Sequence, residues 1–215
     1  MQARTEGTMT ESNGTVPQNA TLISIAQRHS IRAFTEQPVP DDHLKAILRA
    51  ANQAPSAHNQ QSWRFIIVTG DKKKALAHLV TSRASQFPRP SSGLLRMAAR
   101  SIQSAPVVIA VANTGELIAR GAHLFKVENE TAHDFFRTME IQSSAAAVEN
   151  LLVAATSLGL ATVWLGILFL MKDEILDFLG ERRGEFMAVV PVGYAARPAA
   201  GPNKISVEQV VKFLQ

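Results

Sequence analysis

Apolar residues recur at helical spacing over several stretches of the chain, and short β-rich runs separate these stretches. Leu44, Ile47, Leu48 and Ala51, for example, lie at i, i+3, i+4 and i+7 and so form one apolar helix face. The stretches that this pattern predicts to be helical are 22–29, 44–51, 72–79, 131–158 and 172–179. Asp41-Asp42 is expected to cap the second helix, after the break at Pro38-Val39-Pro40.

The strand signals are short runs rich in β-branched and aromatic residues. They predict strands at residues 64–69, 106–111, 162–167 and 187–192. The second run is apolar throughout, so it is expected to be buried on both faces of a sheet. Gly159 and Gly180 stand where a helix would end in a left-handed residue. Residues 82–93 are expected to form a polar loop, and residues 113–129 to be irregular. Helices and strands interleave without strict βαβ alternation, which favours an α+β arrangement.

Composition limits the number of domains and the classes of chemistry. With 215 residues, 46% of them hydrophobic, the chain can form one compact domain with a sizeable core. We expect residues 1–20, which carry few large apolar side chains, to be a disordered tail before a single domain at 21–215. The chain has no cysteine, which excludes disulfides, thiolate metal sites and a cysteine nucleophile.

The charge balance and the apolar run at 151–171 bear on partners and location. A net charge of +4 and 6% aromatic residues, with Lys72-Lys73-Lys74 as the one dense basic run, give no reason to expect a nucleic-acid partner. The run at 151–171 is interrupted by Thr156, Gly159 and Thr162, so we interpret it as a buried helix and strand, not a membrane span. The N-terminus resembles neither a signal peptide nor a transit segment, which favours the cytoplasm.

The common motifs of several enzyme classes are missing from the sequence. It has no G-x-G-x-x-G dinucleotide fingerprint, no phosphate-binding G-x-x-x-x-G-K-[ST] loop, no H-E-x-x-H pair and no G-x-S-x-G nucleophile elbow. The six histidines show no ligand spacing, so no metal site is expected. Hydrolase chemistry is disfavoured as well, because neither Ser30 nor Ser56 has a suitably spaced histidine and acid.

Two polar segments remain as candidates for chemistry. In Arg28-His29-Ser30-Ile31-Arg32, two guanidinium groups flank a hydroxyl and can hold a phosphate with two forks. The segment from Ala54 to Trp63 is a small polar loop before a strand, and its backbone N–H groups can face a flat heterocycle. Each also has an ordinary explanation. Arg28 and Arg32 are spaced as on a solvated helix edge, and Pro55-Ser56-Ala57 fits a plain turn.

Together and in this order, the two segments resemble the nitroreductase family of flavoproteins. The similarity includes the Arg-x-Ser-x-Arg start, the Pro-Val-Pro break, the Ala-Pro-Ser-x-x-Asn-x-Gln-x-Trp loop and the strand that follows it. Downstream, residues 142–155 are similar to the family's long central helix, 158–166 to its next loop and strand, and 190–194 to its last core strand. The resemblance runs from residue 22 to the C-terminus and is weakest at 81–129.

The resemblance implies an α+β, nitroreductase-like fold: a central, mostly antiparallel β-sheet flanked by helices, with the long central helix at a homodimer interface. It also implies FMN at that interface, contacted by both chains. The residues that would hold its phosphate and its ribityl and pyrimidine edge are Arg28, His29, Ser30, Arg32 and Lys204. The residues that would line the ring from the other chain are Pro55, Ser56, Ala57 and Asn59. The residues that would pack beside the reactive edge are Val163, Trp164, Leu165 and Gly166. Trp164 could equally be a core residue.

The function that this resemblance implies is hydride transfer from NADH or NADPH, by way of the flavin, to a nitroaromatic, a quinone or a similar small molecule in ping-pong turnover. No catalytic side chain is expected, since the cofactor carries the chemistry. Two alternatives stay open. One is a family dehydrogenase or oxidase that acts on a small cyclic or azoline substrate. The other is a flavin-binding module without NAD(P)H turnover.

Overall fold

The computed structural model describes residues 19–125 and 128–214. Of the predicted tail, residues 1–18 therefore lie outside the described residues. Helix α1, Ala20–Gln27, begins inside the predicted tail, and its N-cap is Asn19, whose Oδ1 accepts a hydrogen bond from Leu22 N–H at 2.9 Å.

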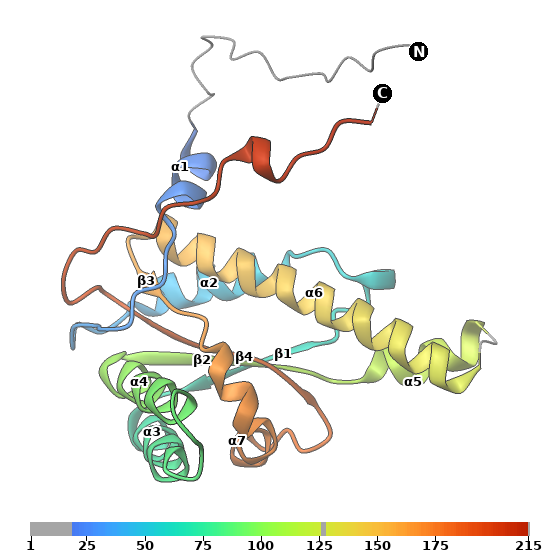
Figure 1. The fold of residues 1–215 in the computed structure, drawn as a ribbon, viewed down its shortest axis with the longest axis horizontal. Helices are drawn as coiled ribbons and strands as arrows, with labels where there is room; N and C mark the ends of the chain where they lie inside the picture. The colour runs from blue at the N-terminus through green and yellow to red at the C-terminus, as the bar shows by residue number, and fades with distance from the viewer. Residues whose placement is uncertain (1–18, 126–127, 215) are drawn as a thin grey trace.

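A four-stranded sheet with the order β1-β2-β4-β3 forms the centre of the molecule (Figure 1). Its strands are β1 (Trp63–Val68), β2 (Val107–Asn113), β3 (Ala161–Thr162) and β4 (Glu185–Gly193). All three pairings within it are antiparallel. This confirms the predicted α+β class, with an antiparallel sheet flanked by helices.

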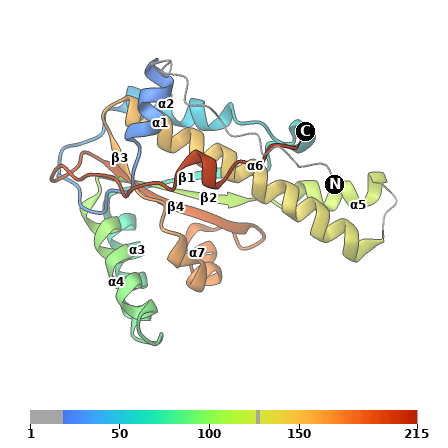
Figure 2. The same ribbon diagram turned by 45° about the horizontal axis from the view of Figure 1, so that its top comes forward.

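Helices cover both faces of the sheet. The helices α2 (Asp41–Asn52) and α6 (Asn129–Ser157) lie on one face, with α1 against the end of α6. The helices α3 (Gly70–Ala84), α4 (Ser91–Ser104) and α7 (Lys172–Leu179) lie on the other (Figures 1 and 2).

Strand β2 shows how the apolar pattern builds this arrangement. All of its residues are buried, which confirms the prediction for the second strand. Val107, Ile109 and Val111 join the core beneath α2 and α6, whereas Val108, Ala110 and Ala112 join the core beneath α3, α4 and α7. Because successive side chains of a strand point to opposite faces of the sheet, this one apolar run contributes to both hydrophobic cores.

The predicted polar loop at 82–93 is too long. Helix α3 continues to Ala84, and α4 begins at Ser91, which leaves residues 85–90 between them. Leu95, Ala98, Ala99 and Ile102 recur at i, i+3, i+4 and i+7 and are all buried. Because α3 and α4 pack against each other, these apolar positions have a partner that the local sequence does not reveal.

The prediction of an irregular 113–129 is wrong as well. Strand β2 includes Asn113, and helix α5 runs over Glu116–Phe125. The N-terminus of α5 is held by a side chain from α6, because Glu140 Oε1 accepts a hydrogen bond from Leu117 N–H at 2.7 Å. A helix stabilised by a distant carboxylate is not visible in its own sequence.

The predicted strand at 162–167 is only partly a strand. The chain pairs with β4 at Ala161 and Thr162 and then turns into a short 3₁₀ helix, η2, over Gly166–Met171. A short apolar run can be a strand or another buried segment, and its periodicity does not distinguish the two.

Helices α6 and α7 end at the predicted glycines, but the predicted N-cap of α2 is wrong. Gly159 and Gly180 have φ of +73° and +80°, which confirms the expected left-handed positions after α6 and α7. The N-cap of α2 is Pro40, so Asp41 and Asp42 lie in the first turn, where their negative charges interact favourably with the helix dipole. Within the described residues, no helix has the length and apolarity that crossing a membrane requires.

Candidate functional site

The Arg-Ser-Arg segment leaves helix α1 and runs as extended chain beside the sheet. Arg28 is the C-cap of α1, with an extended backbone at φ −63° and ψ 123°. Ser30 then forms a parallel bridge with Thr162, and Ile31 N–H donates to the Thr162 carbonyl at 2.9 Å. Arg28 and Arg32 are therefore not neighbours on a solvated helix edge, and the ordinary explanation for their spacing is wrong.

This segment forms one wall of a cavity of about 970 Å³. The residues that line it are Ala26, Gln27, Arg28, His29, Ser30, Arg32, Ala199, Ala200, Gly201, Pro202 and Lys204. All five residues expected at the phosphate, ribityl and pyrimidine edge thus meet in one place, although Lys204 is far away in sequence. Three cationic side chains and one hydroxyl around one cavity suit a phosphorylated ligand.

A second, smaller cavity of about 160 Å³ adjoins Arg32. The residues that line it are Arg32, Leu94, Met97, Ala98, Ser101, Val163, Trp164, Leu165, Gly166 and Ile167. All four residues expected beside the reactive edge are among them. The two cavities share Arg32 as a lining residue.

The backbone of the 163–166 segment presents Gly166 to this second cavity. Leu165 N–H donates to the Val189 carbonyl at 3.0 Å and is thus used by the sheet. Gly166 begins η2, where N–H groups have no partner within the helix, and a Cβ on it would meet no atom within 4 Å. Of these two N–H groups, that of Gly166 is therefore the one that η2 leaves without a partner inside the helix. Trp164 is half-buried: it packs against the core and also lines the cavity, and its stacking on a ring stays a prediction.

The loop expected to line the ring has a strained and well-anchored backbone. His58, Asn59 and Gln61 all have φ near +52°, a conformation that is uncommon outside glycine. Ser56 Oγ accepts from Gln61 N–H, and Ala57 N–H donates to Ser143 Oγ on α6, both at 3.1 Å. Uncommon backbone conformations that surrounding hydrogen bonds maintain are frequent in ligand-binding loops.

This loop does not meet the other candidate residues within one chain. Ser30 bridges Thr162, which pairs with Val192, and Val192 pairs with Val107 at one end of β2. The loop leads into Trp63, which pairs with Asn113 at the other end of β2. With a rise of about 3.4 Å per residue, the two ends are roughly 20 Å apart. Pro55, Ser56, Ala57 and Asn59 therefore lie near the opposite end of the sheet from the Arg-Ser-Arg segment and its cavity.

Sequence reasoning missed two parts of these cavities. Leu94, Met97 and Ser101 come from α4, whose helical spacing was a usable signal. Residues 199–202 have no such signal: they reach the first cavity only because the chain crosses over His29 after β4, where Gly201 packs so closely that a Cβ would lie 3.1 Å from His29 Cβ.

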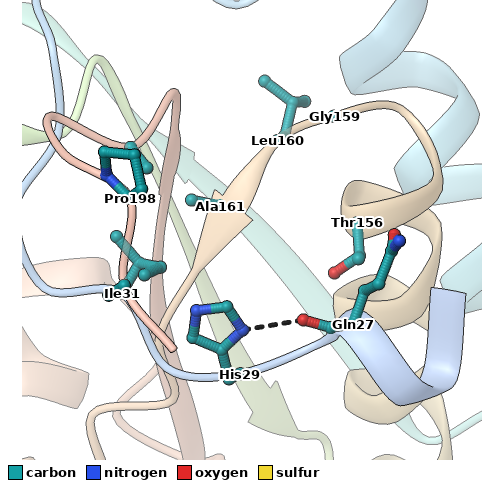
Figure 3. Close-up of a pocket in the computed structure, with 10 residues that line it drawn as sticks. Gln27, His29, Ile31, Thr156, Gly159, Leu160, Ala161 and Pro198 are labelled. Carbon is teal, nitrogen blue, oxygen red and sulfur yellow. Dashed lines mark hydrogen bonds between the residues drawn. The ribbon is translucent and has the colours of Figure 1, made fainter. Parts of the chain in front are cut away.

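A third cavity, of about 260 Å³, lies behind the Arg-Ser-Arg segment (Figure 3). His29 separates it from the first cavity and lines both. Its Nδ1 is 2.7 Å from the Gln27 carbonyl, which can only accept, so Nδ1 carries the proton. Nε2 is buried without a hydrogen-bond partner among the described residues. Within those residues there is no group of three or more potential metal ligands.

Comparison with known proteins places this arrangement in a family. The model of the nitroreductase family matches residues 25–194. An NADH dehydrogenase of Thermus thermophilus is 27% identical over 217 residues, which cover 92% of this chain and 97% of that protein. Two solved structures are similar in fold. A nitroreductase with bound FMN from Desulfitobacterium hafniense has a TM-score of 0.70 at 23% identity and covers 93% of this chain and 100% of its own.

The second solved structure, a nitroreductase with bound FMN from Bacteroides fragilis, has a TM-score of 0.69 at 22% identity. The match covers 92% of this chain and 100% of that one. At these identities the two structures show the fold alone, whereas the family model extends over most of this chain and both candidate segments. The chain therefore belongs to the nitroreductase family of oxidoreductases.

Proposed function

We propose that the protein is an FMN-dependent oxidoreductase that takes a hydride from NADH or NADPH and reduces a nitroaromatic, a quinone or a similar small acceptor in ping-pong turnover. The observation that carries this proposal is the convergence of Arg28, Ser30, Arg32 and Lys204 on one cavity, with Arg32 also lining the second cavity at Gly166. The name of the Thermus thermophilus relative supports a nicotinamide donor.

The residues present fit FMN at three points. The larger cavity supplies cations for a phosphate, and the smaller one supplies apolar side chains from α4 for one edge of a flat ring. Gly166, with open space at its Cα, supplies a backbone N–H for a ring nitrogen. FMN, when bound, provides a ring that accepts a hydride and passes the electrons on.

Each part of the chain then has a physical task. Arg28, Ser30 and Lys204 hold the phosphate by charge-assisted hydrogen bonds. Arg32 places a positive charge beside the pyrimidine edge, where it stabilises added negative charge. The N–H of Gly166 fixes the reactive edge, and no protein side chain has to act as a base.

We further propose that two chains build each site. The loop of residues 55–59 leads to the end of β2 that lies roughly 20 Å from the end nearest the Arg-Ser-Arg segment, so we infer that it lines a ring in a second copy. Residues 205–214 at the C-terminus support association, because they expose large apolar side chains to solvent. Ile205, Val207, Val210, Phe213 and Leu214 are 54% to 85% exposed. Apolar surface of this extent is typical of an interface.

The reductase half of the proposal is tested by anaerobic titration of the FMN-loaded protein with NADH and, separately, with NADPH. We expect either nucleotide to bleach the flavin absorbance and a quinone or nitroaromatic to restore it. Bound FMN that dithionite bleaches and neither nucleotide does would contradict the NAD(P)H reductase and favour a dehydrogenase or a flavin-binding module. Failure to take up FMN at all would contradict the proposed cofactor.

A further inference from the structure

An acidic side chain from α6 stands behind the phosphate-like cavity. Glu149 Oε1 is 3.5 Å from Arg28 Nε, and this ion pair joins α6 to the end of α1. Glu149 does not line the 970 Å³ cavity, whereas Arg28 does. Arg28 therefore contacts the carboxylate and also lines the cavity.

The edge that Glu149 contacts decides what it can do. A guanidinium has five N–H donors, of which Nε supplies one and the two terminal nitrogens supply four. With the carboxylate at Nε, the terminal nitrogens stay available for a phosphate, which favours a two-pronged contact. The Arg28 side chain is only 22% exposed, and that of Glu149 is 52% exposed. The arginine is thus held with little freedom, while its partner is half in solvent.

We propose that Glu149 is a positioning residue that fixes Arg28 for the phosphate of the cofactor and so raises the protein's preference for FMN over riboflavin. This inference rests on the proposed function, since it assumes that the cavity takes FMN. The ion pair is formed between two residues of the chain itself, so Glu149 can hold the arginine in place before a phosphate binds. Ordering one long side chain on binding costs about 0.5–1.5 kcal/mol, and an arginine already in place avoids that cost.

The opposite effect of Glu149 is smaller. Its negative charge lies on the same side of the site as the phosphate and weakens binding by repulsion. Because Glu149 is half in solvent, that repulsion is screened, and the positive charges of Arg28, Arg32 and Lys204 outnumber it in the site. Positioning therefore outweighs repulsion.

The test compares the affinities of the apoprotein for FMN and riboflavin, measured by quenching of flavin fluorescence, in the wild type and in Glu149→Gln. We expect the substitution to weaken FMN binding by about 2- to 10-fold and to leave riboflavin binding unchanged. Glu130→Gln is the matched control, because it removes the same charge from an exposed position on the same helix, roughly 28 Å away.

A double-mutant cycle separates positioning of Arg28 from a general loss of structure. In an Arg28→Ala background, Glu149→Gln should cause no further loss of FMN affinity. A variant that binds FMN as well as or better than the wild type would overturn the inference and leave the proposed function standing. Equal losses for FMN and riboflavin would also overturn it. A wild-type protein that binds neither flavin would overturn both the inference and the proposed function.

Discussion

Replacement of Glu140 by glutamine should stabilise the protein, and increasingly so as the pH rises. Glu140 is 1% exposed: Oε1 accepts a hydrogen bond from Leu117 N–H, while Oε2 is buried near the Ser62 hydroxyl without a hydrogen bond of good geometry. Burial raises the pKa of this carboxyl, and the surrounding donors, Leu117 N–H first and the Ser62 hydroxyl next, oppose the shift. Glutamine keeps an oxygen for Leu117 N–H and removes the buried charge.

The sign of the pH dependence follows from linkage. Because the folded-state pKa is raised, the folded protein keeps the Glu140 proton at pH values where the unfolded chain has lost it. The stability that this contributes is fully present below the ordinary glutamate pKa and is lost as the pH rises through the folded-state pKa. Glutamine does not titrate, so the variant avoids this loss. The NH2 group of the glutamine takes the place of Oε2, so the gain comes from removal of the titrating charge, and the advantage should grow between about pH 5 and about pH 8.

The assay is urea unfolding of the apoprotein at about pH 5 and about pH 8. The quantity to compare is the free energy of unfolding of Glu140→Gln minus that of the wild type. Glu130→Gln serves as control, because the exposed Glu130 should show no such pH-dependent difference. A Glu140→Gln variant that is less stable than the wild type at about pH 8, or whose advantage does not change with pH, would refute the reasoning.

Three further predictions concern packing and the cofactor cavity. Gly121→Ala should destabilise the protein by about 1–3 kcal/mol in thermal or urea unfolding, because its Cβ would lie 2.5 Å from the buried Phe136 ring; Gly93→Ala, with no atom within 4 Å, should be neutral or stabilising, and equal effects would contradict the argument. Ile109→Ala, at a fully buried position of β2, should cost about 2–5 kcal/mol in urea unfolding, and a cost below 1 kcal/mol would argue against a packed central strand. Lys204→Ala should weaken FMN binding about 10-fold without affecting riboflavin in a fluorescence titration, and an equal effect on both would place Lys204 away from the phosphate.

The sequence was sufficient for the parts of the fold whose signals are local. Strand β2 was predicted because burial on both faces of a sheet requires apolar residues at every position. Gly159 and Gly180 were predicted because a positive φ favours glycine at that position. Helix α4 was missed although its apolar positions recur at helical spacing, and α5 was misjudged because its N-terminus is held by Glu140, which is distant in sequence. The strand predicted at 162–167 bends away after Thr162 for a similar reason, since Leu165 N–H bonds to Val189.

The candidate site divides in the same way. The Arg28–Arg32 segment could be identified from residue types and order, and the structure brings it together with Lys204 and the 163–166 segment. The crossing of residues 199–202 over His29 and the placement of Glu149 behind Arg28 are tertiary contacts. No spacing along the chain encodes either of them.

The most direct test of the central claim, a flavin site built from two chains, is complementation between two defective variants. Arg32→Ala removes a cavity charge, and Asn59→Asp places a carboxylate in the ring loop while keeping a residue type that tolerates positive φ. Each variant alone should bind FMN weakly, since every site in it carries a defect. When differently tagged chains are produced together in equal amounts, random pairing should restore about a quarter of the wild-type number of tight FMN sites. If no tight sites are restored, each chain builds its site alone, and the account of a shared site is wrong.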